Sequence, residues 1–65
     1  MKILVNGAWH EMRSRELAGA LEELGFGGSV VSTAVNGEFV AVGQRTERRL
    51  SDGDRVEILA PMQGG

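Results

Sequence analysis

Short apolar runs alternate with pairs of turn-forming residues along the chain, and this pattern predicts most of its elements. Lys2–Val5 reads as a short strand. The pair Asn6-Gly7 that follows favours a type I′ hairpin turn, because both central residues of that turn need positive φ. The return strand is expected over Ala8–Met12, so the N-terminal part of the chain is predicted to be a β-hairpin.

The second half of the chain repeats this arrangement. Ser29–Val35 is rich in β-branched residues and reads as a strand, and an Asn-Gly pair at 36–37 leads into a return strand over Glu38–Val42. The sequence Ser-Asp-Gly-Asp at 51–54 is typical of a turn. It leads into the last predicted strand, Arg55–Leu59.

Between these two halves, apolar residues recur with the period of a helix. They occupy positions i, i+3, i+4 and i+7: Leu17, Ala20, Leu21 and Leu24. We expect Ser14 to be the N-cap and Glu16 to lie in the first turn, where a negative charge suits the helix dipole. Gly25 stands where a C′ glycine is common, so the helix should end just before it.

The order strand, strand, helix, strand, strand, strand predicts an α+β domain with two layers. We expect a mixed sheet of four to five strands with one helix packed on one face, and with the first and last strands parallel at its centre. The two-residue period of a strand sends one set of side chains toward the helix: Ile3, Val5, Val56 and Ile58. It sends the other set to the open face: Lys2, Leu4, Arg55, Glu57 and Leu59.

That open face carries two apolar residues in a charged surround. Leu4 and Leu59, beside Arg55 and Glu57, form a candidate docking surface for a partner protein. The alternative is that both leucines are half-covered strand residues without a binding role, because isolated exposed apolar residues are common.

Length and composition narrow the functional classes. With 65 residues we expect one domain over residues 1–65, with a modest core. The chain has no cysteine, and we identify neither a signal peptide nor an apolar run long enough to span a membrane. We therefore expect a cytoplasmic protein that is monomeric when free. Its net charge of −2 argues against nucleic acid as the main partner.

The reactive side chains do not form a catalytic or metal-binding group. His10 is the single histidine and reads as a solvated strand residue. Asp52 and Asp54 fit turn formation and capping better than a carboxylate pair. Trp9 is interpreted as a packing residue, with an interface anchor as the alternative. A small basic cluster is interpreted as a solvated loop: Arg45, Arg48 and Arg49.

The last six residues carry the most distinctive chemistry. Pro61 cannot donate to a sheet ladder, so residues 60–65 should form a flexible tail beyond the last strand. One reading is a frayed end. The other is that Gly64 and Gly65 can thread a narrow channel and present the C-terminal carboxylate to a partner enzyme. That carboxylate could attack the α-phosphate of ATP and form an acyl-adenylate, which a sulfur donor or an amine could then attack.

The whole chain resembles the sulfur carrier protein of thiamin biosynthesis, the ThiS family. The resemblance rests on four segments in order: Lys2–Gly7, Val35–Val40, Leu50–Ile58 and the terminal Gly64-Gly65. It implies the ubiquitin-like β-grasp fold and the role of a carrier, not an enzyme.

The resemblance also implies a cycle of reactions at the tail. An ATP-dependent activating enzyme would adenylate Gly65, and a sulfur donor such as a cysteine desulfurase would supply the sulfur of a thiocarboxylate. Thiazole synthase would accept that sulfur. No cofactor would bind the carrier itself, and Met62, Gln63 and Gly64 would line the partners' channels.

One segment departs from the family. Many members carry a Val-Pro-Arg-Ser-Gln-like run after the Asn-Gly-Glu sequence, whereas here residues 40–45 read Val-Ala-Val-Gly-Gln-Arg. Whether Arg45 replaces the missing arginine is left open by the sequence. Four alternatives also stay open: a sister carrier for molybdopterin synthesis, a carrier that serves cysteine synthesis or the thiolation of tRNA, a ubiquitin-like protein modifier, and a binding module of the same fold.

Overall fold

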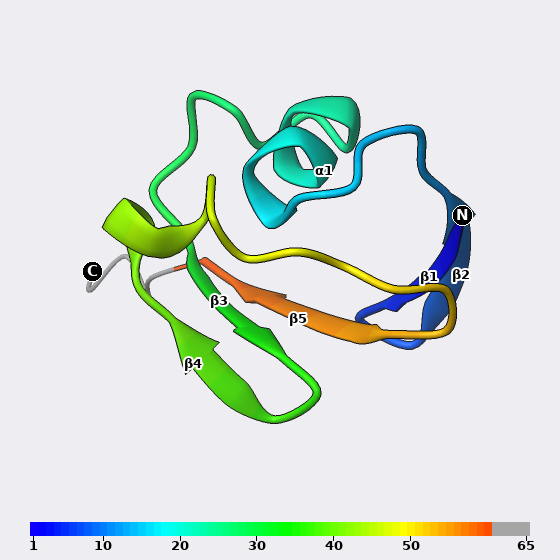
Figure 1. Ribbon diagram of the computed structural model, residues 1–65. Coiled ribbons are helices and arrows are strands. Elements are labelled where there is room, and N and C mark those ends of the chain that lie inside the picture. The colour runs from blue at the N-terminus through cyan, green and yellow to red at the C-terminus, as the bar shows by residue number, and fades with distance from the viewer. Residues whose placement is uncertain (61–65) are drawn as a thin grey trace.

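The described part of the chain is made up of seven short elements. In the computed structural model, which describes residues 1–60, they are β1 (Lys2–Val5), β2 (Ala8–Glu11), α1 (Leu17–Glu23), β3 (Ser32–Val35), β4 (Glu38–Val40), the 3₁₀ helix η1 (Val42–Gln44) and β5 (Arg55–Leu59). The five strands form one sheet in the order β2-β1-β5-β3-β4, and α1 covers one face of it (Figure 1). The α+β prediction of a mixed sheet with one helix is confirmed.

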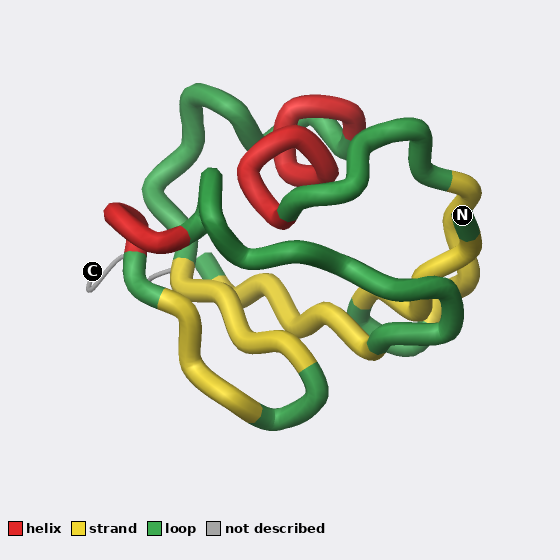
Figure 2. Tube along the Cα trace, viewed as in Figure 1, coloured by secondary structure: helices red, strands yellow, loops and turns green. Residues whose placement is uncertain are grey.

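Strand β5 is the centre of the sheet. It runs parallel to β1, with Val5 opposite Val56, and antiparallel to β3, with Thr33 opposite Ile58. The last strand of the sequence is therefore inserted between the two hairpins, as Figure 2 shows. The chain that leads to the tail starts from the most internal strand of the sheet.

Both hairpins turn at an Asn-Gly pair, as predicted. Asn6 and Asn36 have φ of 47° and 51°, and the glycines that follow them have φ of 86° and 83°. These are the left-handed values that a type I′ turn requires, and asparagine and glycine adopt them at the lowest cost. The two-residue turns fix the register of each hairpin, and so decide which side chains face the helix.

The core lies between α1 and the sheet. Its members are Ile3, Val5, Met12, Leu17, Ala20, Leu21, Val31, Val35, Val40, Leu50, Val56 and Ile58. All four strand residues predicted to face the helix are among them. Leu24 and Phe26 are partly buried against this core, at the end of the helical stripe.

The start of the helix differs from the prediction. Ser14 is not the N-cap and Glu16 does not lie in the first turn: the N-cap is Glu16, whose side chain makes no capping hydrogen bond. The backbone N–H groups of Leu17 and Ala18 instead donate to the carbonyl oxygens of Arg48 and Arg45, at 2.9 and 3.0 Å. Carbonyls from a distant loop thus satisfy donors that a capping side chain would otherwise serve.

Figure 1 shows this loop, residues 45–54, passing along the helix on its way to β5. The loop also provides a donor: the Leu50 N–H forms a hydrogen bond to the Arg15 carbonyl oxygen at 2.8 Å. Leu50 itself is buried in the core and anchors the loop there.

A carboxylate on α1 organises the segment before the helix. Glu23 accepts hydrogen bonds from the backbone N–H groups of Arg13 and Ser14, at 3.0 and 2.6 Å. These two hydrogen bonds stabilise the ionised form of Glu23 and so lower its pKa from the ordinary value of 4.5. The bond from Arg13 has the larger effect and the bond from Ser14 the smaller one.

Three strands are shorter than predicted. β2 ends at Glu11, not Met12, and Met12 turns into the core. β3 begins at Ser32, not Ser29, because Ser32 pairs with Leu59, where β5 ends. β4 ends at Val40, not Val42, because the backbone then forms η1, with the Gln44 N–H donating to the Ala41 carbonyl at 2.9 Å.

Candidate functional site

The root of the tail lies at the end of the central strand. β5 ends at Leu59, and Ala60 is the last residue that the structure describes. The predicted tail residues Met62, Gln63, Gly64 and Gly65 lie outside the described residues, so their roles stay predictions.

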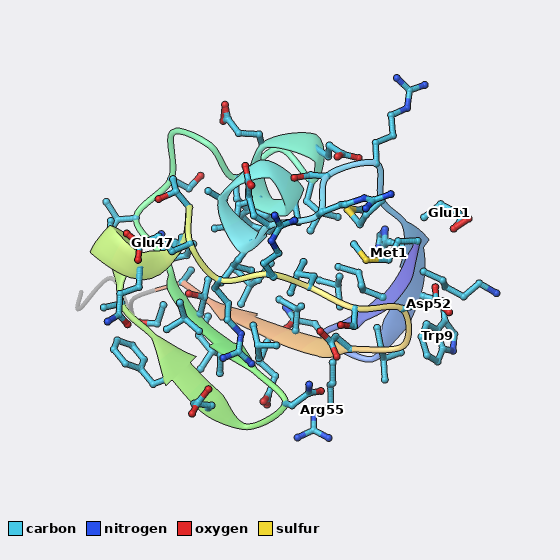
Figure 3. The ribbon with its side chains drawn as sticks, viewed as in Figure 1. Met1, Trp9, Glu11, Glu47, Asp52 and Arg55 are labelled. Atoms are coloured by element: carbon cyan, nitrogen blue, oxygen red, sulfur yellow. The ribbon has the colours of Figure 1, made fainter. Side chains whose placement is uncertain are left out.

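The open face of the sheet adjoins this root. Along β5 the side chains alternate, with Val56 and Ile58 buried and Arg55, Glu57 and Leu59 exposed. In Figure 3 the labelled Arg55 projects from the sheet on the side away from α1. The predicted parity of β5 is therefore confirmed: Leu59 lies on the open face, with 67% of its surface exposed.

Three apolar residues gather on this face beside the tail root, and we call them the tail patch: Ala34, Phe39 and Leu59. Ala34 pairs directly with Phe39 across β3 and β4, and Ser32 pairs with Leu59 across β3 and β5. Phe39 is 68% exposed. Together with Glu57, these residues line a shallow hollow of about 130 Å³. Exposed aromatic and aliphatic side chains around a hollow are typical of protein interfaces.

A second row crosses the other end of the face, and we call it the distal row: Trp9, Leu4 and Arg55. Leu4 pairs with Trp9 across β1 and β2, and with Arg55 across β1 and β5. The Lys2 ammonium nitrogen lies 5.9 Å from the centroid of the Trp9 ring, within cation–π range. Trp9 is 56% exposed, so the interpretation of this residue as a packing residue is wrong.

The open face is therefore divided into two regions. Arg55 and Leu59 are four residues apart on one strand, which corresponds to about 13 Å. The structure places the predicted residues Leu59 and Glu57 next to the tail root, and Leu4 and Arg55 in the distal row. Leu4 and Leu59 do not form one apolar cluster.

Sequence reasoning missed Phe39. Its position was implied by the Asn-Gly turn, which pairs Val35 with Glu38 and then Ala34 with Phe39. Since Val35 faces the core, Ala34 and Phe39 must face the open side. The signal was present but depended on combining turn type with strand parity.

Two arginines of the basic cluster form contacts within the protein. The Arg45 guanidinium donates to the Thr33 hydroxyl at 3.1 Å and to the Val31 carbonyl at 2.5 Å. Arg48 forms an ion pair with Glu38 at 2.6 Å. Because the Arg45 guanidinium is bound within the fold, its position favours a structural role over a replacement for the family's Pro-Arg contact.

The acidic residues of the turn at 51–54 have a structural role, as predicted from the sequence. Asp52 accepts a hydrogen bond from the Lys2 N–H at 2.7 Å, and Asp54 accepts one from the Ser51 N–H at 2.7 Å. Within residues 1–60 there is no group of three histidine or acidic side chains that could hold a metal ion. Nor is the described helix long and apolar enough to cross a membrane.

Comparison with known proteins decides the family. The model of the ThiS family matches residues 3–65, which is nearly the whole chain and includes the terminal Gly-Gly. The chain belongs to the ThiS family. This membership supports a sulfur carrier role in thiamin biosynthesis, and the family consists of small carriers, not catalysts.

A solved structure agrees with this assignment. The crystal structure of the thiamine biosynthesis protein (ThiS) from Geobacter metallireducens is similar to this chain, with a TM-score of 0.84 and 28% sequence identity over 100% of both chains. The fold is therefore the β-grasp fold of the ThiS family. No curated protein matches the chain.

Proposed function

We propose that this ThiS-family chain carries sulfur on its C-terminal glycine, Gly65, for the thiazole ring of thiamin. The observation that carries the proposal is the family match, which extends through Gly64 and Gly65 to the end of the chain. The last two residues are glycines, so no side chain stands beside the terminal carboxylate. The carrier supplies the carboxylate and the docking surface, and its partners supply the catalysis.

The chemistry has two steps. An oxygen of the Gly65 carboxylate attacks the α-phosphate of ATP on the activating enzyme, and pyrophosphate leaves. Sulfur transfer follows: the outer sulfur of a persulfide on a donor such as a cysteine desulfurase attacks the carbonyl of the acyl-adenylate and displaces AMP, and a thiol reductant then cleaves the S–S bond of the resulting acyl disulfide. The product is a thiocarboxylate, which delivers its sulfur to thiazole synthase.

The tail patch is proposed as the surface that docks on the activating enzyme. It lies at the root of the tail, so a partner that receives the tail must approach this end of the open face. Phe39 and Leu59 are large, exposed and apolar, and side chains of this kind contribute much of the binding energy at interfaces. Arg55 and Leu4, which lie in the distal row, should contribute less.

Intact mass spectrometry tests the chemistry. The chain is incubated with ATP, the cognate activating enzyme and a sulfur source, and a chain extended by one alanine after Gly65 serves as the control. We expect the wild-type mass to rise by the exchange of one oxygen for one sulfur, mapped to Gly65, with no change in the control. An unchanged wild-type mass, in a mixture that thiolates a known carrier, would contradict the proposal.

The thiolated chain then tests the acceptor. Transfer of its sulfur to thiazole synthase would support the thiamin role, whereas transfer to a molybdopterin synthase large subunit would favour the sister pathway. An amide bond to a lysine of another protein would favour a ubiquitin-like modifier.

A further inference from the structure

An asparagine side chain binds the backbone of β5 near each end of the strand. At the start, Asn36 accepts a hydrogen bond from the Arg55 N–H at 2.9 Å, and its amide donates to Asp54 at 3.0 Å. Near the exit, Asn6 accepts from the Ile58 N–H at 2.8 Å and donates to the Ile58 carbonyl at 2.9 Å. Both asparagines hold the first position of an Asn-Gly turn.

The side chain of Asn6 binds the backbone of β5 at a position where β1 no longer pairs with it. The pairing of β1 with β5 covers Leu4 with Arg55 and Val5 with Val56, after which the chain turns away into the hairpin. The Asn6 backbone N–H still donates to the Val56 carbonyl at 3.0 Å, and its side-chain amide then pairs with both backbone groups of Ile58. A primary amide presents an acceptor oxygen and a donor N–H on the same edge, as the C=O and N–H of one residue in an extended strand do.

This contact lies two residues before the tail root at Ala60. On the opposite edge, β3 pairs with β5 as far as Leu59. The Asn6 amide therefore supports β5 on its β1 side at the point where β3 supports the other side. The two contacts together fix the direction in which the chain leaves the sheet.

We propose that Asn6 is a positioning residue for the chemistry at Gly65. The inference rests on the proposed function, because it concerns how the terminal carboxylate reaches a partner's active site. Without the Asn6 amide, the exit of β5 would lose its support on the β1 side, and Ala60 would shift relative to the tail patch that is proposed to dock on the activating enzyme. Because the rate of reaction depends on how the reacting groups are placed, a displaced tail root should slow the adenylation of a docked carrier.

Asparagine suits both demands at this position. The turn needs a positive φ, which asparagine tolerates, and the contact needs one donor and one acceptor. Asn6→Gly would keep the turn and remove the amide. Asn6→Asp would keep the acceptor for the Ile58 N–H but lose the donor to the Ile58 carbonyl.

The chain contains a matched control for this test. Asn36→Gly also replaces the first residue of an Asn-Gly turn, also removes two side-chain hydrogen bonds near β5, and acts at the end of the strand away from the tail. Asn6→Gly, Asn36→Gly and Asn6→Asp are each compared with the wild type by thermal unfolding. Each is then assayed for adenylation by pyrophosphate release, with the carrier varied to saturation at a temperature where all four proteins are folded.

Separate values of kcat and KM distinguish positioning from simple destabilisation. Partial unfolding lowers the concentration of competent carrier, so it raises the apparent KM and leaves kcat at saturation unchanged. Misplacement of the tail on a docked carrier lowers kcat instead. We expect Asn6→Gly to lower kcat about fivefold to tenfold with KM within about twofold, Asn6→Asp to lie between it and the wild type, and Asn36→Gly to keep kcat within about twofold.

Equal kcat values for Asn6→Gly and Asn36→Gly would overturn the inference. So would a change confined to KM in Asn6→Gly. Both results presuppose an active wild type and leave the proposed function intact. A wild-type chain that releases no pyrophosphate, beside a known carrier that does, would contradict the proposed function and the inference with it.

Discussion

The two faces of β5 differ in burial, although both are formed by the same five residues. Val56 and Ile58 face α1 and are almost fully buried, whereas Glu57 and Leu59 face the open side and are exposed. The buried side contacts the core that holds the fold together, and the exposed side leads directly to the tail. Alternation along one strand thus separates the residues that stabilise the protein from those proposed to engage its partners.

The largest effect on stability is expected from a substitution on the buried face of β5. Ile58→Ala removes core volume beneath α1 and should lower the free energy of unfolding by about 2–5 kcal/mol. Leu59→Ala, one residue further on, should change it by less than about 0.5 kcal/mol, because Leu59 is exposed. Urea denaturation of both variants measures the two values. Similar losses from both would mean that the division between the two sides of β5 is wrong.

The next prediction concerns the exposed side. Leu59→Glu places a charge in the tail patch and should weaken binding to the activating enzyme about tenfold or more, equivalent to about 1.4 kcal/mol. Trp9→Glu is the matched control on the same face, in the distal row, and should weaken binding by less than about threefold. Titration calorimetry measures both affinities. Equal losses would show that the partner covers the whole face, and an unfolded Leu59→Glu would contradict its placement.

The smallest effect tests whether an exposed polar residue can contribute to stability. Glu23 is exposed, yet its carboxylate accepts two backbone hydrogen bonds that lower its pKa. The pKa is lower in the folded state, so the stabilisation is present above the ordinary value of 4.5 and is lost as the pH falls through the folded-state pKa. Glu23→Gln should therefore be less stable than the wild type at neutral pH, and the difference should shrink as the pH falls below 4.5.

Urea denaturation of the wild type and of Glu23→Gln at several pH values measures this difference. A constant gap between the two proteins from neutral to acidic pH would mean that the Glu23 charge does not contribute through these hydrogen bonds.

Features encoded by neighbouring residues were predicted well from the sequence. Both Asn-Gly turns adopt the positive φ values that their residues favour, because the conformational demand and its solution lie in the same two residues. The strand alternation that buries Ile3, Val56 and Ile58 was also predicted, because burial follows the two-residue period directly.

Features that depend on distant contacts could not be predicted in the same way. The helix begins at Leu17, and not close behind Ser14, because carbonyls of residues 45 and 48 accept its first N–H groups. The bond between Asn6 and Ile58 joins residues 52 positions apart. Local sequence gives Asn6 a role in a turn and gives no sign of its second role beside the tail root.

The candidate site was predicted in part for the same reason. Leu59 and its exposure follow from strand parity, but its neighbours depend on the order of the strands. β3 and β4 bring Ala34 and Phe39 to Leu59, whereas β1 places Leu4 beside Arg55 at the other end. The chemistry of Gly65 was inferred from the sequence alone, since the tail residues 61–65 lie outside the described structure.

The most direct test of the central claim is the thiolation of a chain that lacks Gly65, measured by intact mass against the wild type. The account predicts that this chain unfolds at the wild-type temperature and gains no sulfur, because the fold depends on the buried side of β5 and the chemistry on the terminal glycine. Sulfur gained by the shortened chain at the wild-type rate would contradict the account. A clear loss of thermal stability would contradict its separation of fold from function.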